Sequence, residues 1–261
     1  MQKAIVVPCY NEAQRLNVRL FGEFIGPSGI SFLFVDDGST DQTGSVLRDL
    51  CDRHLAAHWV KLKVNQGKAE AVRQGMMHAI GKGAEMVGYF DADLATPLEE
   101  IVALFRLVEG GGFAVALASR VKMLGCNIQR KPTRHLLGRL FATLASAVLK
   151  IPVYDTQCGA KVFRVSAEFE AALRHPFVTR WAFDVELIGR LLAPEKNVKP
   201  MPLSSMVEMP LRRWADVGDS KVNFLGSLGM GIDLIRIWWQ LQGRERHSEQ
   251  IVDSGSSERA A

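Results

Sequence analysis

Four carboxylates follow two apolar runs of the chain, each at the point where a buried strand would end. Asp36 and Asp37 follow one run, and Asp91 and Asp93 follow another. Carboxylate oxygens suit Mg²⁺ or Mn²⁺, which usually keep several waters and share the phosphates of a substrate. A cation at Asp91 and Asp93 would neutralise a leaving diphosphate. An Asp-x-Asp pair alone is more often an ordinary turn, but four carboxylates in one array favour a nucleotide and metal site.

The segment after the first apolar run could also contact a nucleotide. It contains Pro8, Tyr10, Asn11 and Glu12, and it carries neither a P-loop nor a Gly-x-Gly-x-x-Gly pattern. This argues against P-loop kinases and dinucleotide oxidoreductases. Tyr10 can stack on a base, and Asn11 and Glu12 can hydrogen-bond or cap a helix. An ordinary loop that enters a helix is the other interpretation.

One stretch of the chain, residues 110–154, contains no Asp or Glu. Its seven positive charges are Arg120, Lys122, Arg130, Lys131, Arg134, Arg139 and Lys150. The net charge of +4, from 32 basic and 28 acidic residues, hides this local excess. Such a surface should bind an anion, so nucleic acid, anionic lipid and a phosphorylated substrate are candidates beside a merely solvated face. Aromatic residues do not interleave with these charges as a stacking platform would require, which disfavours nucleic acid.

These groups need elements that hold them together, and the first half of the chain alternates strand and helix patterns. Apolar runs predict strands at 4–7, 32–35, 60–64, 86–90 and 114–118, and periodicity predicts helices at 13–25, 41–54, 68–80 and 97–108. Strands separated by helices of this length predict βαβ units and a mostly parallel α/β sheet. Ligands bind beyond the carboxyl ends of such strands, so both aspartate pairs should lie at one edge.

The second half of the chain is less regular. It predicts helices at 136–149, 181–192 and 224–241, a strand at 161–165, an extended or looping stretch at 194–210 and a disordered polar tail from residue 243. The 261 residues, 48% hydrophobic and 23% charged, fit an ordinary globular protein. The four cysteines lack metal-site and disulfide spacing, which favours a reducing compartment. No run reaches the roughly 18 apolar residues of a membrane span.

The order and spacing of the motifs resemble the inverting glycosyltransferases of family 2, which have the GT-A fold. The segments that carry this resemblance are Val7–Glu12, Val35–Asp41, Asn65–Lys68 and Asp91–Asp93. Further segments look like the dolichyl-phosphate β-glucosyltransferase branch: Ala118–Arg120, Asp155–Lys161, Arg180–Glu186 and Trp214–Val222. The resemblance implies a GT-A domain over 1–222, an apolar interfacial helix over 223–242 and a polar tail over 243–261.

The resemblance also implies substrates and roles. It implies UDP-glucose as the leading donor, Mg²⁺ or Mn²⁺ as cofactor, and a polyprenyl phosphate, dolichyl or undecaprenyl, as acceptor. One alternative keeps the fold but has GDP-mannose as donor or a soluble hydroxyl acceptor. Another is a scaffold protein that binds a sugar nucleotide without turnover. The residues expected around the nucleotide are Pro8, Tyr10, Asn11, Glu12, Asp36, Asp37, Lys68 and Asp91. Those expected at the acceptor are Arg120, Arg130, Arg134 and Gln157. Asp91 and Asp93 would hold the metal, and the expected catalytic residues are Asp91, Asp93, Asp184 and Arg120.

A phosphate acceptor changes what catalysis requires. Its second pKa is near 6, so it is largely a dianion at neutral pH and needs no strong base. The acceptor and the donor are both anions, so the protein needs positive charge that holds them close together. Residues 110–154, which contain no Asp or Glu, offer this charge. Arg130 and Arg134 would share a helix face, although Pro132 between them suggests that the helix starts there. We therefore hypothesise that Asp184 orients a basic residue or the sugar, with a salt bridge in helix 181–192 as the alternative.

A polyprenyl acceptor would bring the protein to a bilayer surface. Helices 136–149 and 224–241 are strongly apolar, and Trp238 and Trp239 stand near the end of the second. Tryptophan favours the membrane interface, and an apolar helix beside a cationic patch binds anionic leaflets without spanning them. We expect a peripheral protein on the cytoplasmic face of a membrane. The alternative is that both helices pack in the core or in a dimer interface; the sequence does not indicate an oligomeric state.

Overall fold

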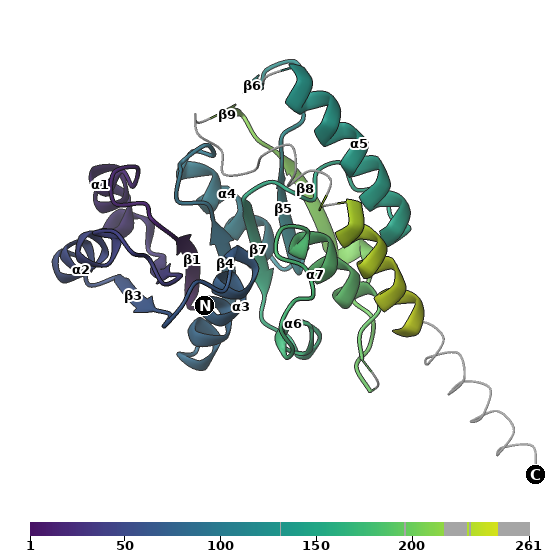
Figure 1. Cartoon of the computed structure of the whole chain (residues 1–261), viewed down its shortest axis with the longest axis horizontal. Coiled ribbons are helices and arrows are strands. Elements are labelled where there is room, and N and C mark those ends of the chain that lie inside the picture. The colour runs from purple at the N-terminus through teal and green to yellow at the C-terminus, as the bar shows by residue number, and fades with distance from the viewer. Residues whose placement is uncertain (131, 196, 217–228, 230, 245–261) are drawn as a thin grey trace, which may run out of the picture.

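A seven-stranded sheet forms the centre of the molecule (Figure 1). The computed structural model describes residues 1–130, 132–195, 197–216, 229 and 231–244. Its strands are β1 (Lys3–Cys9), β2 (Ser31–Asp36), β3 (Ala57–Lys61), β4 (Met86–Phe90), β5 (Val115–Ser119), β6 (Asn127–Gln129), β7 (Ala160–Arg164), β8 (Met206–Pro210) and β9 (Arg213–Ala215). Its helices are α1 (Val18–Ser28), α2 (Thr43–Arg53), α3 (Lys68–Gly81), α4 (Glu99–Glu109), α5 (Pro132–Leu149), α6 (Ala167–Leu173) and α7 (Phe183–Leu192), followed by a helix over 231–244.

The strand order is β3-β2-β1-β4-β7-β5-β8, and β6 pairs with β9 in a separate two-stranded sheet. Strand β7 runs antiparallel to both of its neighbours, β4 and β5, while the other pairs in the large sheet are parallel. The predicted α/β architecture, a mostly parallel sheet flanked by helices, is therefore confirmed. Because β1, β2 and β4 are parallel, their carboxyl ends meet at one edge of the sheet.

Helices cover both faces of the sheet, which is why its strands read as unbroken apolar runs. Along β1, Ile5 and Val7 belong to the core cluster with α1, α2 and α4, whereas Ala4 and Val6 belong to the cluster with α3, α6 and α7. This alternation follows from the two-residue period of a strand. The core therefore consists of two apolar layers separated by the sheet.

Two element boundaries differ from the sequence prediction for local reasons. Helix α1 begins at Val18 rather than at 13, because the Glu12 carbonyl first accepts from the N–H groups of Arg15 and Leu16 in a turn. The Asn17 side chain then caps the helix by accepting from the N–H of Leu20. Strand β3 covers 57–61 rather than 60–64, in register with β2.

Several short elements were not predicted. They are β6, β8, β9 and α6, of three to seven residues each. Strand β8 falls in the stretch expected to be extended or looping and pairs with β5. Parts of the predicted helix 224–241, the segment 214–222 and the tail lie outside the described residues, as does Lys131.

The helix over 231–244 packs on the main body beside α5 and α7, as the yellow ribbon in Figure 1 shows. Its Leu234, Ile237 and Leu241 belong to the core cluster that also contains Leu149 of α5. Gly189 of α7 allows the close approach, because a Cβ there would lie 2.8 Å from Leu241. None of the described helices is both long enough and apolar enough to cross a bilayer.

We predict that Gly88→Ala destabilises the protein. A Cβ at Gly88 of β4 would collide with the backbone carbonyl of Lys161 on β7, which cannot rotate away. Overpacking of this kind costs about 1–3 kcal/mol, or roughly 3–10 °C in Tm. Thermal unfolding checks this, with Gly26→Ala as control, because nothing lies within 4 Å of a Cβ there. An unchanged Tm for Gly88→Ala would contradict the prediction.

Candidate active site

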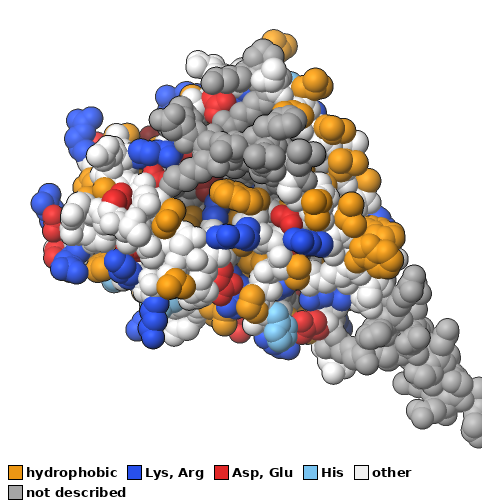
Figure 2. All heavy atoms as spheres, viewed as in Figure 1, with side chains coloured by type: hydrophobic (Ala, Val, Ile, Leu, Met, Phe, Trp, Pro, Cys, Tyr) orange, Lys and Arg blue, Asp and Glu red, His pale blue; other side chains and the backbone are white. Residues whose placement is uncertain are grey.

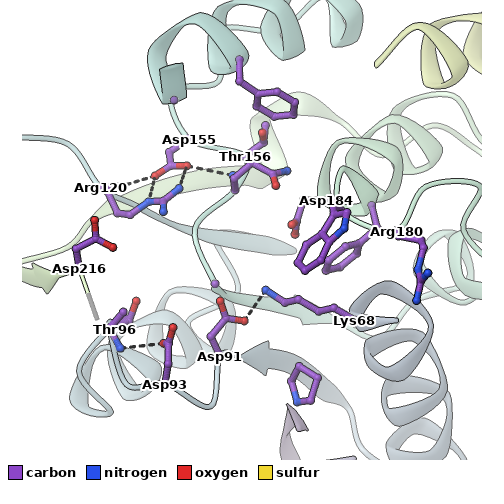
Figure 3. A pocket seen from close by; sticks show the side chains of 18 of the residues that line it. Lys68, Asp91, Asp93, Thr96, Arg120, Asp155, Thr156, Arg180, Asp184 and Asp216 are labelled. Atoms are coloured by element: carbon purple, nitrogen blue, oxygen red, sulfur yellow. Dashed lines mark hydrogen bonds and ion pairs between the residues drawn. The ribbon is translucent and has the colours of Figure 1, made fainter. Parts of the chain in front are cut away.

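A cavity of about 790 Å³ opens beyond the carboxyl ends of β1, β2 and β4, and the first residues of α3 and α7 lie in its walls (Figure 3). Helix α5 and the loop after β5 complete it. The expected site residues that line this cavity are Pro8, Tyr10, Glu12, Asp37, Lys68, Asp91, Asp93, Arg120, Arg130, Gln157 and Asp184. The carboxylates after β2 and β4 thus meet at one edge, through Asp37, Asp91 and Asp93. The side chain of Arg134 lies outside the described part of the chain.

Two expected nucleotide-binding residues, Asn11 and Asp36, do not line the cavity. Asp36 is fully buried and accepts a 2.8 Å hydrogen bond from the N–H of Ser39. Asn11 accepts one of 2.9 Å from the N–H of Thr40. Because neighbouring side chains at the end of a strand point in opposite directions, Asp37 faces the cavity and Asp36 does not. Asn11 and Asp36 therefore shape the loop behind the site.

Asp37 joins the loop after β2 to the loop before α3. Its two carboxylate oxygens accept hydrogen bonds of 2.7 Å and 2.8 Å from the N–H groups of Gln66 and Gly67. Burial nevertheless raises the pKa of Asp37. Across the cavity mouth, the Arg180 guanidinium donates a 3.1 Å hydrogen bond to the side-chain oxygen of Asn65. The sequence motif contained Arg180, but sequence reasoning gave it no role.

Lys68, the first residue of α3, forms a 2.5 Å ion pair with Asp91, which follows β4. Burial acts to lower the pKa of Lys68, but the charges of Asp91 and Asp184 outweigh it and raise that pKa. Asp93 accepts a 3.0 Å hydrogen bond from the N–H of Ala95. Burial, and then the charge of Asp91, raise the pKa of Asp93. The two carboxylates therefore lie close enough to repel each other.

Asp91 leaves no room for a side chain at Gly159, the residue just before β7. The N–H of Asp91 donates a 2.9 Å hydrogen bond to the carbonyl of Gly159, and a Cβ on Gly159 would collide with the Asp91 carboxylate. No cluster of three or more His, Cys, Asp or Glu side chains that could hold a metal occurs in the described residues. Asp91 and Asp93 thus fit a hard cation that takes its other ligands from water and phosphate.

The basic stretch supplies the opposite end of the cavity, and Asp155 organises it. The Arg120 guanidinium forms a two-pronged ion pair with Asp155, at 2.7 Å and 2.8 Å. Burial works to raise the pKa of Asp155, but the Arg120 charge and hydrogen bonds lower it to about 2. The guanidinium groups of Arg120 and Arg130 both lie over the ring of Trp214, 5.3 Å and 5.7 Å from its centroid. The positive charge of Arg120 is therefore neutralised within the protein by Asp155.

Two further residues support this end of the cavity through contacts that the sequence did not predict. The carboxylate of Glu208, on β8, accepts hydrogen bonds from the N–H groups of Tyr154 and Asp155 at 2.7 Å and 2.8 Å. Arg139 of α5 lies 3.7 Å from the centroid of the Tyr154 ring and donates to the Tyr154 carbonyl. No local sequence pattern pointed to Glu208, since it lies more than 50 residues from the groups it holds.

Asp184 lines the cavity and belongs to a buried cluster in its wall. Its Oδ1 forms a 2.9 Å ion pair with Lys161 of β7 and accepts a hydrogen bond from the hydroxyl of Tyr89 on β4. Lys161 also donates to the Tyr89 hydroxyl at 2.8 Å and to the Cys158 carbonyl at 2.6 Å. Sequence reasoning allowed Asp184 a salt bridge but did not identify Lys161 or Tyr89.

One wall of the cavity is apolar and continues to the outside. Leu137, Leu140 and Leu144 of α5 line the cavity, yet 46%, 59% and 47% of these side chains is exposed. Figure 2 shows a row of hydrophobic side chains along α5 that continues to the helix over 231–244. The cavity therefore joins an interior lined by charged side chains to an exposed apolar face.

Several known proteins are similar to this chain in sequence or in structure. A family described as "Glycosyl transferase family 2" matches residues 4–169. A dolichyl-phosphate beta-glucosyltransferase of Drosophila melanogaster is 35% identical over 91% of this chain and 74% of its own length. One of Trichomonas vaginalis is 30% identical over 89% of this chain and 69% of its own. Glucosyl-3-phosphoglycerate synthase of Mycobacterium tuberculosis, solved with Mn²⁺, UDP and glucosyl-3-phosphoglycerate, is 18% identical, with a TM-score of 0.66 over 93% of this chain and 80% of that one.

We predict that Asp155→Asn lowers stability in a pH-dependent way. Because the pKa of Asp155 falls from an ordinary 3.8 to about 2 on folding, its ionisation stabilises the protein by about 2 kcal/mol above pH 4. This contribution is lost as the pH falls from 4 to 2, so the difference from wild type should shrink by roughly half at pH 3.

Urea unfolding at pH 5, 4 and 3 measures this difference. Asp49→Asn, at an exposed position on α2, is the control and should show no such trend. A difference between Asp155→Asn and wild type that widens toward pH 3 would show that the ion pair does not stabilise the fold.

Proposed function

The chain belongs to glycosyl transferase family 2, and we propose that it transfers glucose from UDP-glucose to a polyprenyl phosphate at a membrane surface, with inversion at the anomeric carbon. The observation that carries the proposal is the cavity itself. Its interior holds carboxylates and cations at the edge of a parallel sheet, and its α5 wall runs out into exposed leucines. Such a site suits one nucleotide substrate and one substrate with an anionic head and a hydrocarbon chain.

The named relatives support both substrates. The curated relatives are dolichyl-phosphate beta-glucosyltransferases, which favours glucose and a lipid phosphate. The solved glucosyl-3-phosphoglycerate synthase binds UDP with Mn²⁺, which favours a uridine donor. It also binds phosphoglyceric acid, so a soluble phosphorylated acceptor is the second candidate. The exposed leucines beside the cavity favour the lipid.

In the proposed reaction, the acceptor phosphate supplies its own nucleophile. One of its anionic oxygens attacks the anomeric carbon while the bond from that carbon to the diphosphate oxygen breaks, and the bonding pair leaves with UDP. No proton has to be removed, so the protein must supply alignment and positive charge. Lys68 and Arg180 supply it at the nucleotide end, and Arg130 and Arg139 at the acceptor end.

Arg120 has a different part in this proposal from Arg130. Its two-pronged pair with Asp155 fixes the loop that carries Gln157, whose N–H donates to Asp155 at 3.1 Å. Arg120 thus shapes the acceptor end, where Gln157 lines the cavity. Asp91 and Asp93 would hold Mg²⁺ or Mn²⁺, which would offset the charge of the leaving diphosphate.

An exposed apolar face supports peripheral membrane contact. Leu136 and Leu140 of α5 are 72% and 59% exposed, and Ile235 and Trp239 of the helix over 231–244 are 58% and 64% exposed. Hydrophobic side chains gather along α5 and the helix over 231–244 on one side of the molecule (Figure 2). Large apolar groups at a cavity mouth would place that mouth against the bilayer, where a lipid phosphate is found.

We predict that the protein releases UDP from UDP-glucose when a short polyprenyl phosphate and Mg²⁺ or Mn²⁺ are present. Asp93→Ala should lower kcat at least about 100-fold, because charge stabilisation by a metal is worth several kcal/mol. Lys122→Ala, an exposed position that does not line the cavity, is the control and should keep wild-type activity. A donor screen that also contains GDP-mannose, with phosphoglyceric acid as rival acceptor, measures both specificities.

The outcomes of the screen are distinct. Turnover of GDP-mannose alone would refute the donor, and turnover with phosphoglyceric acid alone would refute the lipid acceptor. Near-normal activity of Asp93→Ala without divalent cation would refute the metal assignment.

We also predict that the protein floats with anionic liposomes and that Leu140→Glu combined with Trp239→Glu weakens this binding at least about tenfold. Removal of two large apolar side chains from a bilayer interface forfeits more than the 1.4 kcal/mol that a tenfold change requires. Leu55→Glu is the matched control, since Leu55 is fully exposed in the loop before β3. A wild-type protein that stays out of the liposome fraction would count against membrane contact.

A further inference from the structure

We infer that Lys161 is a positioning residue for the transfer: it fixes the Asp184 carboxylate by its Oδ1 and leaves Oδ2 to accept a hydrogen bond from a hydroxyl of the bound sugar. The inference deepens the proposed function, on which it rests for the identity of the sugar. In this inference Asp184 binds the sugar rather than transferring a proton. Lys161, which is buried and takes no direct part in the reaction, positions it.

Lys161 is held in place from three sides. It stands on β7, and only 1% of its side chain is exposed. Its ammonium forms a 2.9 Å ion pair with Asp184 and donates hydrogen bonds to the Tyr89 hydroxyl and to the Cys158 carbonyl. A buried charge without a partner costs several kcal/mol. The three contacts therefore fix Lys161 and Asp184 to each other.

Tyr89 reinforces the same geometry. Its hydroxyl lies between the Lys161 ammonium and the Asp184 carboxylate. That hydroxyl accepts from Lys161 and donates to Oδ1 of Asp184. With an ammonium and a hydroxyl both on Oδ1, no position is left there for a transferred proton.

The second oxygen of Asp184 is the one that a substrate can reach. The hydrogen bond from Tyr89 and the shortest approach of the Lys161 ammonium both fall on Oδ1, and within the described residues no hydrogen bond reaches Oδ2. Asp184 lines the same cavity as Asp91 and Lys68, near which the sugar diphosphate would bind (Figure 3). A fixed, ionised carboxylate in that wall is a hydrogen-bond acceptor for a sugar hydroxyl.

The charged and titratable groups around Asp184 come from several elements. They are Tyr89 from β4, Asp91 from the loop after β4, Lys161 from β7 and Lys68 from α3. Lys68 is paired with Asp91 at 2.5 Å. Lys161 is therefore the cation in direct contact with Asp184, and its removal leaves the carboxylate as a buried anion that takes up a proton.

The experiment compares Lys161→Met with a matched control on the same helix as Asp184. Arg190 of α7 forms a buried 2.7 Å pair with Glu186 and does not line the cavity, so Arg190→Met breaks a similar pair away from the site. We measure kcat and the donor KM from pH 6.5 to 8.5 as ratios to wild type, so that ionisation of the acceptor phosphate cancels.

For Lys161→Met the kcat ratio should be at least tenfold lower at pH 6.5 than at pH 8.5, because a protonated carboxyl accepts the hydroxyl much more weakly than the ionised carboxylate does. For Arg190→Met the ratio should not change with pH. A Lys161→Met ratio that is constant with pH would mean that Lys161 is purely structural and would overturn the inference.

A second measurement does not depend on turnover, so it separates this inference from the proposed function. The Tm of Lys161→Met relative to wild type should fall as the pH rises from 5 to 8, because the folded variant holds a proton that it loses at high pH. Lys161→Met combined with Asp184→Asn removes both charges and should recover most of that loss at pH 8. No recovery would overturn the inference, whereas a wild-type protein that releases no UDP would overturn only the proposed function.

Discussion

Charge compensation at the carboxyl edge of the sheet is the constraint on which this cavity depends. Parallel strands bring several aspartates to one partly buried place, where like charges repel strongly. Each is offset by donors from another element: Asp37 by the amides of the loop before α3, Asp91 by Lys68, Asp155 by Arg120 and Asp184 by Lys161. These pairs join the strands to the helices, so the ion pairs that neutralise the site also fix its walls.

The antiparallel strand β7 makes this compensation possible. It enters between β4 and β5 and carries Lys161 inward, while Gly159 just before it packs against Asp91. Gly88 on β4 permits the close contact, because any side chain there would meet the β7 backbone. Two glycines thus let an extra strand approach the centre of the site. The geometry of Asp91 and that of Asp184 are consequently linked through one strand.

The cavity also has two chemically different ends, and this difference supports a reaction between unlike substrates. The nucleotide end is built on β1, β2 and the start of α3, which are rigid elements of the central sheet. The acceptor end is built on loops, on α5 and on Trp214 of β9, with exposed leucines beyond them. In the proposed reaction, one end would hold a compact polar donor and the other would admit a hydrocarbon chain from an apolar phase.

Local sequence patterns predicted much of the site because its residues follow strands. An apolar run that ends in Asp91 or in Asp37 places a carboxylate at the sheet edge regardless of the rest of the chain. The same patterns could not separate Asp36 from Asp37, since only the register of β2 decides which side chain faces the cavity. Arg120 looked like a free anion-binding group, because its partner Asp155 lies 35 residues away.

The sequence by itself determined the α/β class, the family resemblance and eleven of the residues that line the cavity, because these depend on short-range periodicity and on motifs of a few residues. Only the tertiary structure decided which charges are already paired. Contacts such as Lys161 with Tyr89 and Asp184, or Glu208 with the loop before β7, join positions 23 to 95 residues apart. No local pattern records such distances, since they are set by strand order and by the packing of helices on the sheet.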